Sequence, residues 1–261
     1  MDLLLSKDCN RDEFALLYLK LLQETAPDSN FQMTGDMEVK VVDPGGKEAT
    51  TFLHNVWIDY SQDRDNRRAT LERFLSVAPT LTLDSPPLSK EQVVAQVKDS
   101  EYLNLLPQLD LATQHLCGDL WVVFAQDLPD RTIGLKRSEV ERLGVKTSNL
   151  IDLATENLQR IMPAAELHGD GPWYLLTAGG DYTASLLLLN GVWEQLADSV
   201  EGEIVAVVPA RDTLLFTGSK SAEGLKAIKE RATEIVQSGN YLISDTLIVR
   251  RDGRWNVFNA Q

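Results

Sequence analysis

The sequence predicts an α+β fold, with mixed or antiparallel sheets and flanking helices. Three observations favour this class. Residues 11–25 carry apolar side chains at the spacing of one helix face. Two apolar runs, at 118–127 and 202–212, have the length of strands. Gly-containing turns at 44–47 and 252–253 are flanked by β-type residues, which is typical of antiparallel hairpins.

Composition limits the class of protein. With 261 residues the chain can bury roughly 70–75% of its unfolded surface, so its core needs no disulfide or metal. The formal net charge is −14, and the acidic residues are spread along the whole chain. Such a field repels phosphate backbones and anionic lipid. We therefore expect neither a nucleic-acid partner nor a membrane partner.

The N-terminal residues and the cysteines predict a cytoplasmic location. In MDLLLSKDCNRDEF the apolar stretch is three leucines, and Asp2 stands where a signal peptide has positive charge. No run approaches the roughly 20 apolar residues of a membrane span. Cys9 and Cys117 are the only cysteines, too few for a disulfide framework.

Residues 1–78 predict a small α-ββ-α subdomain. Its first helix, at 11–25, starts with the cap pair Asn10 and Glu13. MEVKVVD and EATTFLH flank PGGK and predict a hairpin, and residues 54–77 predict a helix broken near SQDRDN.

A linker is expected over residues 79–110. Three prolines in PTLTLDSPPLSKEQ exclude a helix there and favour extended chain. The C-terminal α+β domain then covers residues 111–261.

The C-terminal domain contains two similar segments. GDLWVVFAQD at 118–127 and GEIVAVVPARD at 202–212 each combine Gly, an acid, an apolar strand and a final Asp. The second is one residue longer near Pro209, where a bulge or strand end tolerates a missing N–H.

Each of these segments is followed by a short strand, a helical region and a hairpin. We expect the helices and hairpin turns at 148–162, Gly179–Gly180, 221–238 and Asp252–Gly253. The pattern predicts two duplicated ββ-α-ββ units, 111–190 and 199–261, joined by a helix near 191–198. The alternative is an α+β chain without duplication, which can produce similar patterns.

Four segments of the chain resemble the YtpQ family of uncharacterised bacterial proteins: DLWVVFAQDL, LATENL, DYTASLLLLNGVWEQL and GEIVAVVPARDTLLF. The resemblance covers roughly residues 90–240, and its most specific piece is Val208-Pro209-x-x-Asp212. The residues between Pro and Asp differ from those of the family, so the resemblance gives no role to Arg211. It implies a soluble bacterial cytoplasmic protein and no reaction, because the family is a domain of unknown function.

Four polar residues are candidates for a ligand-binding site. Arg211 and Asp212 end the second segment, and Asp127 ends the first. An adjacent Arg–Asp pair can clamp a carboxylate or phosphate, or the Asp can cap the turn. Asn157 falls on the inward stripe of the 148–162 helix, together with Leu150, Ala154 and Ile161. A buried amide must be hydrogen-bonded, so Asn157 either holds a neighbouring segment or contacts a ligand.

Other reactive residue types lack a chemical neighbourhood in the sequence. The histidines, His54, His115 and His168, are far apart and without metal-ligand spacing. Ser185 has no Gly-x-Ser-x-Gly elbow, and Cys117 lies in an apolar run typical of core. We predict no catalytic residue, no metal site and no cofactor.

Two classes of function remain. The first is a protein-interaction or accessory protein without catalytic activity, which binds another protein or pairs with itself as a homo-oligomer. The second is an enzyme or small-ligand binder of unfamiliar type, with Asp127, Asn157, Arg211 and Asp212 in a cleft between the duplicated halves. Scattering of these side chains would favour the first class.

Overall fold

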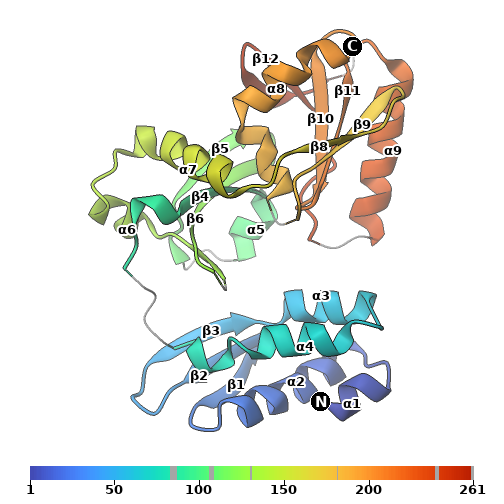
Figure 1. Ribbon diagram of the computed structural model, residues 1–261. Coiled ribbons are helices and arrows are strands. Elements are labelled where there is room, and N and C mark those ends of the chain that lie inside the picture. Colours follow the sequence, from blue (N-terminus) through green and yellow to red (C-terminus); the bar gives the residue numbers. More distant parts are fainter. Residues whose placement is uncertain (83–86, 106–108, 130, 181, 239–240, 260–261) are drawn as a thin grey trace. The chain divides into compact units, whose positions relative to one another are not determined.

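The computed structural model describes residues 1–82, 87–105, 109–129, 131–180, 182–238 and 241–259. In these residues the chain has an α+β fold with antiparallel sheets (Figure 1). The chain divides into two compact units, Met1–Pro86 and Pro87–Gln261. Each unit has hydrophobic cores of its own.

The first unit is a three-stranded antiparallel sheet with helices packed on one face. Its elements are α1 (Asp2–Ser6), α2 (Arg11–Thr25), β1 (Asn30–Gly35), β2 (Glu38–Val42), β3 (Glu48–Phe52), α3 (His54–Gln62), α4 (Arg67–Leu75) and the 3-10 turn η1 (Ala78–Thr80). The strand order is β1-β2-β3. Phe14, Val39, Tyr60 and Leu71 meet in its core.

The local predictions for this unit are confirmed, and one strand was missed. Asn10 Oδ1 accepts a hydrogen bond from Glu13 N at 2.9 Å, and Asn10 N donates to Glu13 Oε2 at 3.3 Å. The hairpin around PGGK forms β2 and β3, and the helix over 54–77 is broken as expected. The sequence prediction of two strands was wrong, because β1 adds a third that contributes only Phe31 and Met33 to the core.

The second unit begins with a sheet of order β4-β6-β5, in which β7 also pairs with β6. Its elements are η2 (Lys90–Gln92), β4 (Val93–Asp99), α5 (Ser100–Leu105), β5 (Thr113–Cys117), β6 (Leu120–Asp127), β7 (Thr132–Gly134), α6 (Arg137–Arg142) and α7 (Thr147–Ile161). Helix α7 covers one face, where Leu150 and Ala154 pack with Ala95 and Phe124. Strand β4 and helix α5 lie within the stretch expected as a linker.

A six-stranded antiparallel sheet of order β13-β12-β10-β11-β9-β8 completes the unit. Its elements are β8 (Glu166–His168), β9 (Trp173–Thr177), η4 (Thr183–Leu188), α8 (Asn190–Leu196), η5 (Ala197–Ser199), β10 (Ile204–Ala210), β11 (Thr213–Gly218), α9 (Ala222–Ser238), β12 (Ile248–Arg251) and β13 (Arg254–Val257). Helix α9 packs on one face of β10, and η4 with α8 packs on the other (Figure 1). Every residue of β10 is therefore buried.

The hairpin expected at Gly179–Gly180 does not form. Residues 183–188 are the 3-10 helix η4, because the indoles of Trp193 and Trp255 donate to the carbonyls of Leu186 and Leu187, both at 2.8 Å. Ser185 therefore lies in a helix and not in a strand. The expected ββ-α-ββ repeat at 111–190 therefore lacks its last strand. Its strand β9 pairs with β11, which belongs to the expected repeat at 199–261.

The second expected repeat, residues 199–261, follows its prediction closely. Strands β12 and β13 turn at Asp252 and Gly253, whose φ angles of 50° and 74° are those of a tight hairpin. The register of β10 shifts between Val207 and Ala210, so the bulge near Pro209 is confirmed.

Helix α9 starts unusually close to the sheet. Ser221 Oγ accepts a hydrogen bond from Gly224 N at 3.0 Å, as expected of a helix cap. A Cβ at position 224 would overlap Thr217 Oγ1 and the carbonyl oxygen of Pro172. Only glycine allows the first turn of α9 to lie this close to β11.

Candidate functional site

Asp127 ends β6 and is held by neighbouring hydroxyl groups. Its Oδ1 accepts a hydrogen bond from Tyr182 Oη at 2.5 Å and another from Thr132 Oγ1 at 3.4 Å. Burial, together with the adjacent Asp127 carboxylate, raises the pKa of Tyr182 above its ordinary value. The phenol therefore stays protonated and donates to the carboxylate, an arrangement that fastens the segment before η4 to the end of β6.

Arg211 and Asp212 form the turn between β10 and β11. The Arg211 guanidinium lies over the Tyr241 ring, 3.3 Å from its centroid, and Arg211 N donates to Tyr241 O at 3.0 Å. Tyr241 has a φ of 53°, in the left-handed region. Asp212 is exposed and accepts a hydrogen bond from Thr213 Oγ1 at 3.1 Å. The two residues therefore differ, since Arg211 stacks on an aromatic ring and Asp212 points to solvent.

Asn157 joins helix α7 to the start of β4. It is 4% exposed, and its amide donates to Lys90 O at 2.7 Å and Val93 O at 2.8 Å. Its Oδ1 accepts a hydrogen bond from Arg160 Nη2 at 3.1 Å. The predicted burial of Ile161 on the inward stripe of this helix is wrong, because Ile161 lies at the helix end and is 39% exposed.

Two of the four residues share a neighbouring segment. Tyr182 binds Asp127, and two residues later Ala184 N donates to Arg211 O at 2.9 Å. Asn157 contacts a different segment, η2 and the start of β4. An open cavity of about 280 Å³ lies between the end of α7 and α8. Its lining includes Met162, Leu186 and Val192 and none of the four candidate residues.

The sequence carries no signal that identifies the partners of these residues. Tyr182, Tyr241 and Arg160 each lie at least 3 positions, and as many as 55, from the residue they contact. Tyr182 stands in the DYTASLL segment, which we expected to be a strand. Of the thiols, Cys117 is buried, and burial raises its pKa to about 11. This thiol is protonated at neutral pH and is not an activated nucleophile.

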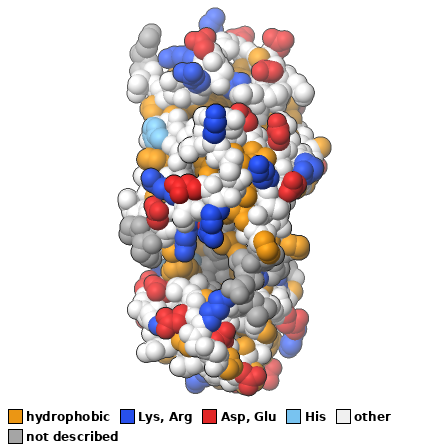
Figure 2. Space-filling model, turned by 90° about the vertical axis from the view of Figure 1, so that its left-hand side faces the viewer, with side chains coloured by type: hydrophobic (Ala, Val, Ile, Leu, Met, Phe, Trp, Pro, Cys, Tyr) orange, Lys and Arg blue, Asp and Glu red, His pale blue; other side chains and the backbone are white. Residues whose placement is uncertain are grey.

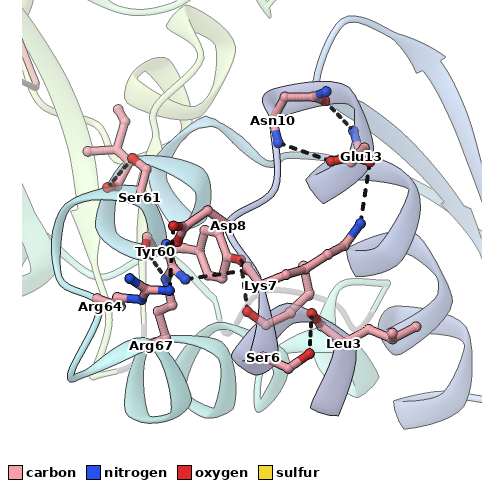
Figure 3. Close-up of polar contacts among 12 residues, drawn as sticks. Leu3, Ser6, Lys7, Asp8, Asn10, Glu13, Tyr60, Ser61, Arg64 and Arg67 are labelled. Carbon is pink, nitrogen blue, oxygen red and sulfur yellow. Dashed lines mark hydrogen bonds and ion pairs between the residues drawn. The ribbon is translucent and has the colours of Figure 1, made fainter.

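A second polar network, in the first unit, fastens the N-terminal residues to α3 and α4 (Figure 3). The Arg67 side chain is 7% exposed and pairs with Asp8 at 2.8 Å. Its Nε donates to Tyr60 O at 3.0 Å, and its guanidinium lies 4.2 Å from the Tyr60 ring centroid. Tyr60 Oη donates to Leu4 O at 2.8 Å, and burial raises its pKa to about 12. These groups bind one another, so the role of the network is to hold the N-terminal residues against α3 and α4.

Among the described strands, β3 pairs only with β2, so its outer edge lies at the end of the sheet. Asp43 N donates to Lys47 O at 3.0 Å, and Leu53 N donates to Met37 O at 2.7 Å. These contacts mark hydrogen-bonded pairs at both ends of the β2–β3 ladder. Hydrogen-bonded and non-hydrogen-bonded pairs alternate along an antiparallel ladder. Residues 47, 49, 51 and 53 therefore direct their N–H and C=O groups toward β2.

It follows that the backbone groups of Glu48, Thr50 and Phe52 point away from the sheet, at its edge. The side chains of these residues are exposed, and Phe52 is 42% exposed. Natural edge strands are usually protected by Pro, Lys, a bulge or a cover. Strand β3 contains neither Pro nor Lys, and its register with β2 is continuous over five residue pairs.

Three other edge strands differ from β3. Strand β1 has an irregular register near Gly35, and β8 spans three residues. The outer edge of β4 is met by η4, where Val97 N donates to Ser185 Oγ at 3.2 Å. Compared with the edges of β1, β8 and β4, the edge of β3 is therefore the best formed for pairing with another strand.

One face of the molecule carries charges of both signs (Figure 2). Figure 2 shows a face on which acidic, basic and hydrophobic side chains are interspersed. In the ranges that the structure covers, no helix is both long and apolar enough to cross a membrane. Within the same ranges, no three His, Cys, Asp or Glu side chains are grouped to hold a metal ion.

Comparison with known proteins finds distant bacterial relatives. The UPF0354 protein lin1649 of Listeria innocua is 20% identical over 236 residues, which span 87% of this chain and 88% of the relative. The UPF0354 protein BH3252 of Halalkalibacterium halodurans is 22% identical over 126 residues, 47% of each chain. The homologues are thus bacterial proteins of an uncharacterised family.

Neither relative's name states a reaction, a ligand or a partner. No protein-family model matches the sequence, and no solved structure matches it.

Proposed function

We propose that this chain is a protein-interaction or accessory protein without catalytic activity, and that it binds its partner by strand addition at β3. The observation that carries the proposal is the open edge of β3, with the outward backbone groups of Glu48, Thr50 and Phe52. An added strand gains main-chain hydrogen bonds there, while alternate side chains give specificity.

The internal bonding of three of the four polar candidates supports the same proposal. Asp127, Asn157 and Arg211 are each engaged by a side chain or backbone group of the chain itself. A ligand would have to displace these contacts.

Site-specific photo-crosslinking in the native host tests the proposal. A photoreactive residue at Thr50 should yield an adduct with a protein. The matched control is Gln32, which is exposed like Thr50 and lies in the same cross-strand row, with Lys40 between them, but at the opposite edge of the sheet. Equal adducts at both positions, or none at Thr50, would contradict strand addition at β3.

A small-ligand site is the second candidate. It has one observation in its favour: Asp127 and Arg211 both contact the segment 182–184. In this alternative the Arg211 guanidinium would bind the anionic group of a small ligand, beside Asp127 and Asp212, and Asn157 would take no part because it contacts η2 and the start of β4. Titration calorimetry with inorganic phosphate and with citrate tests it, since Arg211→Ala should then abolish a measurable heat. Absence of heat in the parent protein would end this candidate.

We also propose that the uncharacterised family of the relatives is the YtpQ family and that the chain acts in the cytoplasm. The four segments quoted above support the first proposal, and the N-terminal composition supports the second. Fluorescence microscopy of a C-terminal fusion in the native host would show diffuse signal if the location is cytoplasmic.

A further inference from the structure

We infer that the partner at β3 is a second copy of this chain, paired antiparallel with Thr50 on the two-fold axis. The inference rests on the proposed function, because it names the occupant of the same edge.

The register follows from the outward backbone groups. Glu48, Thr50 and Phe52 direct their N–H and C=O groups to the edge. If Thr50 faces Thr50 of the second copy, Glu48 faces its Phe52 and Phe52 faces its Glu48. All three outward residues of each copy then lie in hydrogen-bonded pairs. If the register shifts by two residues in either direction, only two of the three outward residues of each copy lie in hydrogen-bonded pairs.

The side chains favour the same register. Thr–Thr pairs across neighbouring strands are favourable, whereas like charges directly opposite are destabilising. Centring on Thr50 places Glu48 opposite an aromatic ring and keeps the two Glu48 carboxylates about 14 Å apart along the strands. Centring on Glu48 would place the carboxylates opposite one another. The strand is therefore self-complementary in one register.

The layers of the unit also continue across this axis. Ala49 and Thr51 stand opposite Val41 and Val39, on the face that the helices cover. A two-fold axis perpendicular to the sheet keeps the helix-covered faces of both copies on one side. The product is one six-stranded antiparallel sheet built from two three-stranded sheets.

The strength of the pairing is limited by its size and by charge. A contact of two five-residue strands falls at the small, transient end of protein interfaces. The net charge of −14 on each copy opposes association at low salt. We therefore expect a dissociation constant between about 1 μM and about 1 mM, with tighter pairing as salt screens the repulsion.

Sedimentation equilibrium of the full chain tests the self-association. The average mass should rise from monomer toward dimer with concentration at about 0.15 M salt. Thr50→Pro removes the outward N–H at the axis without removing a bond to β2, and edge strands accept such a proline. It should weaken the dimer by at least about tenfold, because two axial hydrogen bonds are lost. The matched control Thr50→Val keeps the backbone and should dimerise like the parent.

A disulfide trap tests the register. Hydrogen-bonded pairs have Cα atoms about 5.5 Å apart, a separation that a disulfide can span. Thr50→Cys should therefore give a covalent dimer under mild oxidation. Glu48→Cys, on the same exposed face, should not, because its two copies are about 14 Å apart. The parent, with its own Cys9 and Cys117, gives the background.

The outcomes separate this inference from the proposed function. A strictly monomeric protein up to about 1 mM overturns the inference. So does an unchanged dissociation constant in Thr50→Pro, or equal trapping of Glu48→Cys. A monomer that still forms an adduct with a different protein at Thr50 leaves strand addition standing and removes only the second copy as occupant. If the protein is monomeric and Thr50 also forms no protein adduct, both the second copy as partner and strand addition at β3 are ruled out.

Discussion

Strands β6 and β10 have similar sequences, each with an Asp at or just after its end, yet the two strand ends are held differently. The end of β6 is fixed by side chains, since Asp127 accepts from Tyr182 and Asn157 anchors the neighbouring start of β4. The end of β10 is fixed by backbone contacts and by the stack of Arg211 on Tyr241, both half-buried, and Asp212 points to solvent. A shared sequence pattern therefore does not imply a shared role, because tertiary partners decide whether a strand-end Asp is structural.

The largest effect is expected at Asn157. Asn157→Leu should lower the free energy of unfolding of the second unit by about 2–3 kcal/mol, because the buried carbonyl of Val93 and the part-buried carbonyl of Lys90 lose their donor. Urea unfolding measures the change, and hydrogen exchange should rise first in β4. The control Asn149→Leu changes an exposed amide on the same helix and should cost less than about 0.5 kcal/mol. Similar losses in the two variants would refute the anchoring role.

The bond between Tyr182 and Asp127 should have the next largest effect. Tyr182→Phe leaves the carboxylate with one long hydrogen bond, from Thr132, and should cost about 1–2 kcal/mol. A double-mutant cycle with Asp127→Asn isolates the interaction from other losses. A coupling near zero would mean that the β6 end is no better fastened than the β10 end, and the contrast would disappear.

The same tyrosine predicts a pH dependence. Its pKa is raised in the folded protein, so above about pH 10 the unfolded phenol releases a proton that the folded one keeps. Its contribution to stability is present below about pH 10 and is lost as the pH rises further. Tyr182→Phe should flatten the alkaline loss of stability by about 1.4 kcal/mol per pH unit. Parallel curves for parent and variant, measured by urea unfolding from pH 8 to 11, would argue against a raised pKa of this half-buried phenol.

The smallest effects are expected at the β10 end. Arg211→Ala removes the stack on Tyr241 and should cost about 0.5–1 kcal/mol. Asp212→Ala should change stability by less than about 0.5 kcal/mol, because the side chain is exposed. Thermal unfolding of both variants completes the comparison. If Asp212→Ala lost more stability than Tyr182→Phe, the side chain at the end of β10 would be the more important one, contrary to the comparison drawn above.

Local features were predictable from the sequence. The Asn10–Glu13 cap and the Asp252–Gly253 turn depend on neighbouring residues, and both were predicted correctly. The burial of Asn157 followed from helical periodicity. In contrast, the run TASLLL looks like a strand, and nothing local reveals that two tryptophan indoles hold it as a 3-10 helix.

The partners of the candidate residues could not be predicted, for the same reason. Asn157 binds carbonyls 64 and 67 positions away, and Asp127 binds a phenol 55 positions away. The open edge of β3 was also hidden, because the sequence predicted the hairpin but not which of its strands would end the sheet.

The glycine at the start of α9 also offers a genetic tool. Alanine at position 224 improves helix propensity by about 1 kcal/mol, but its methyl group overlaps a backbone oxygen and a threonine hydroxyl. The result should be a conditional allele, tolerated in the cold and lost on warming. The steric overlap at position 224 lies in the second unit. A host that carries this allele would therefore separate the phenotype of losing the second unit from the phenotype of blocking β3.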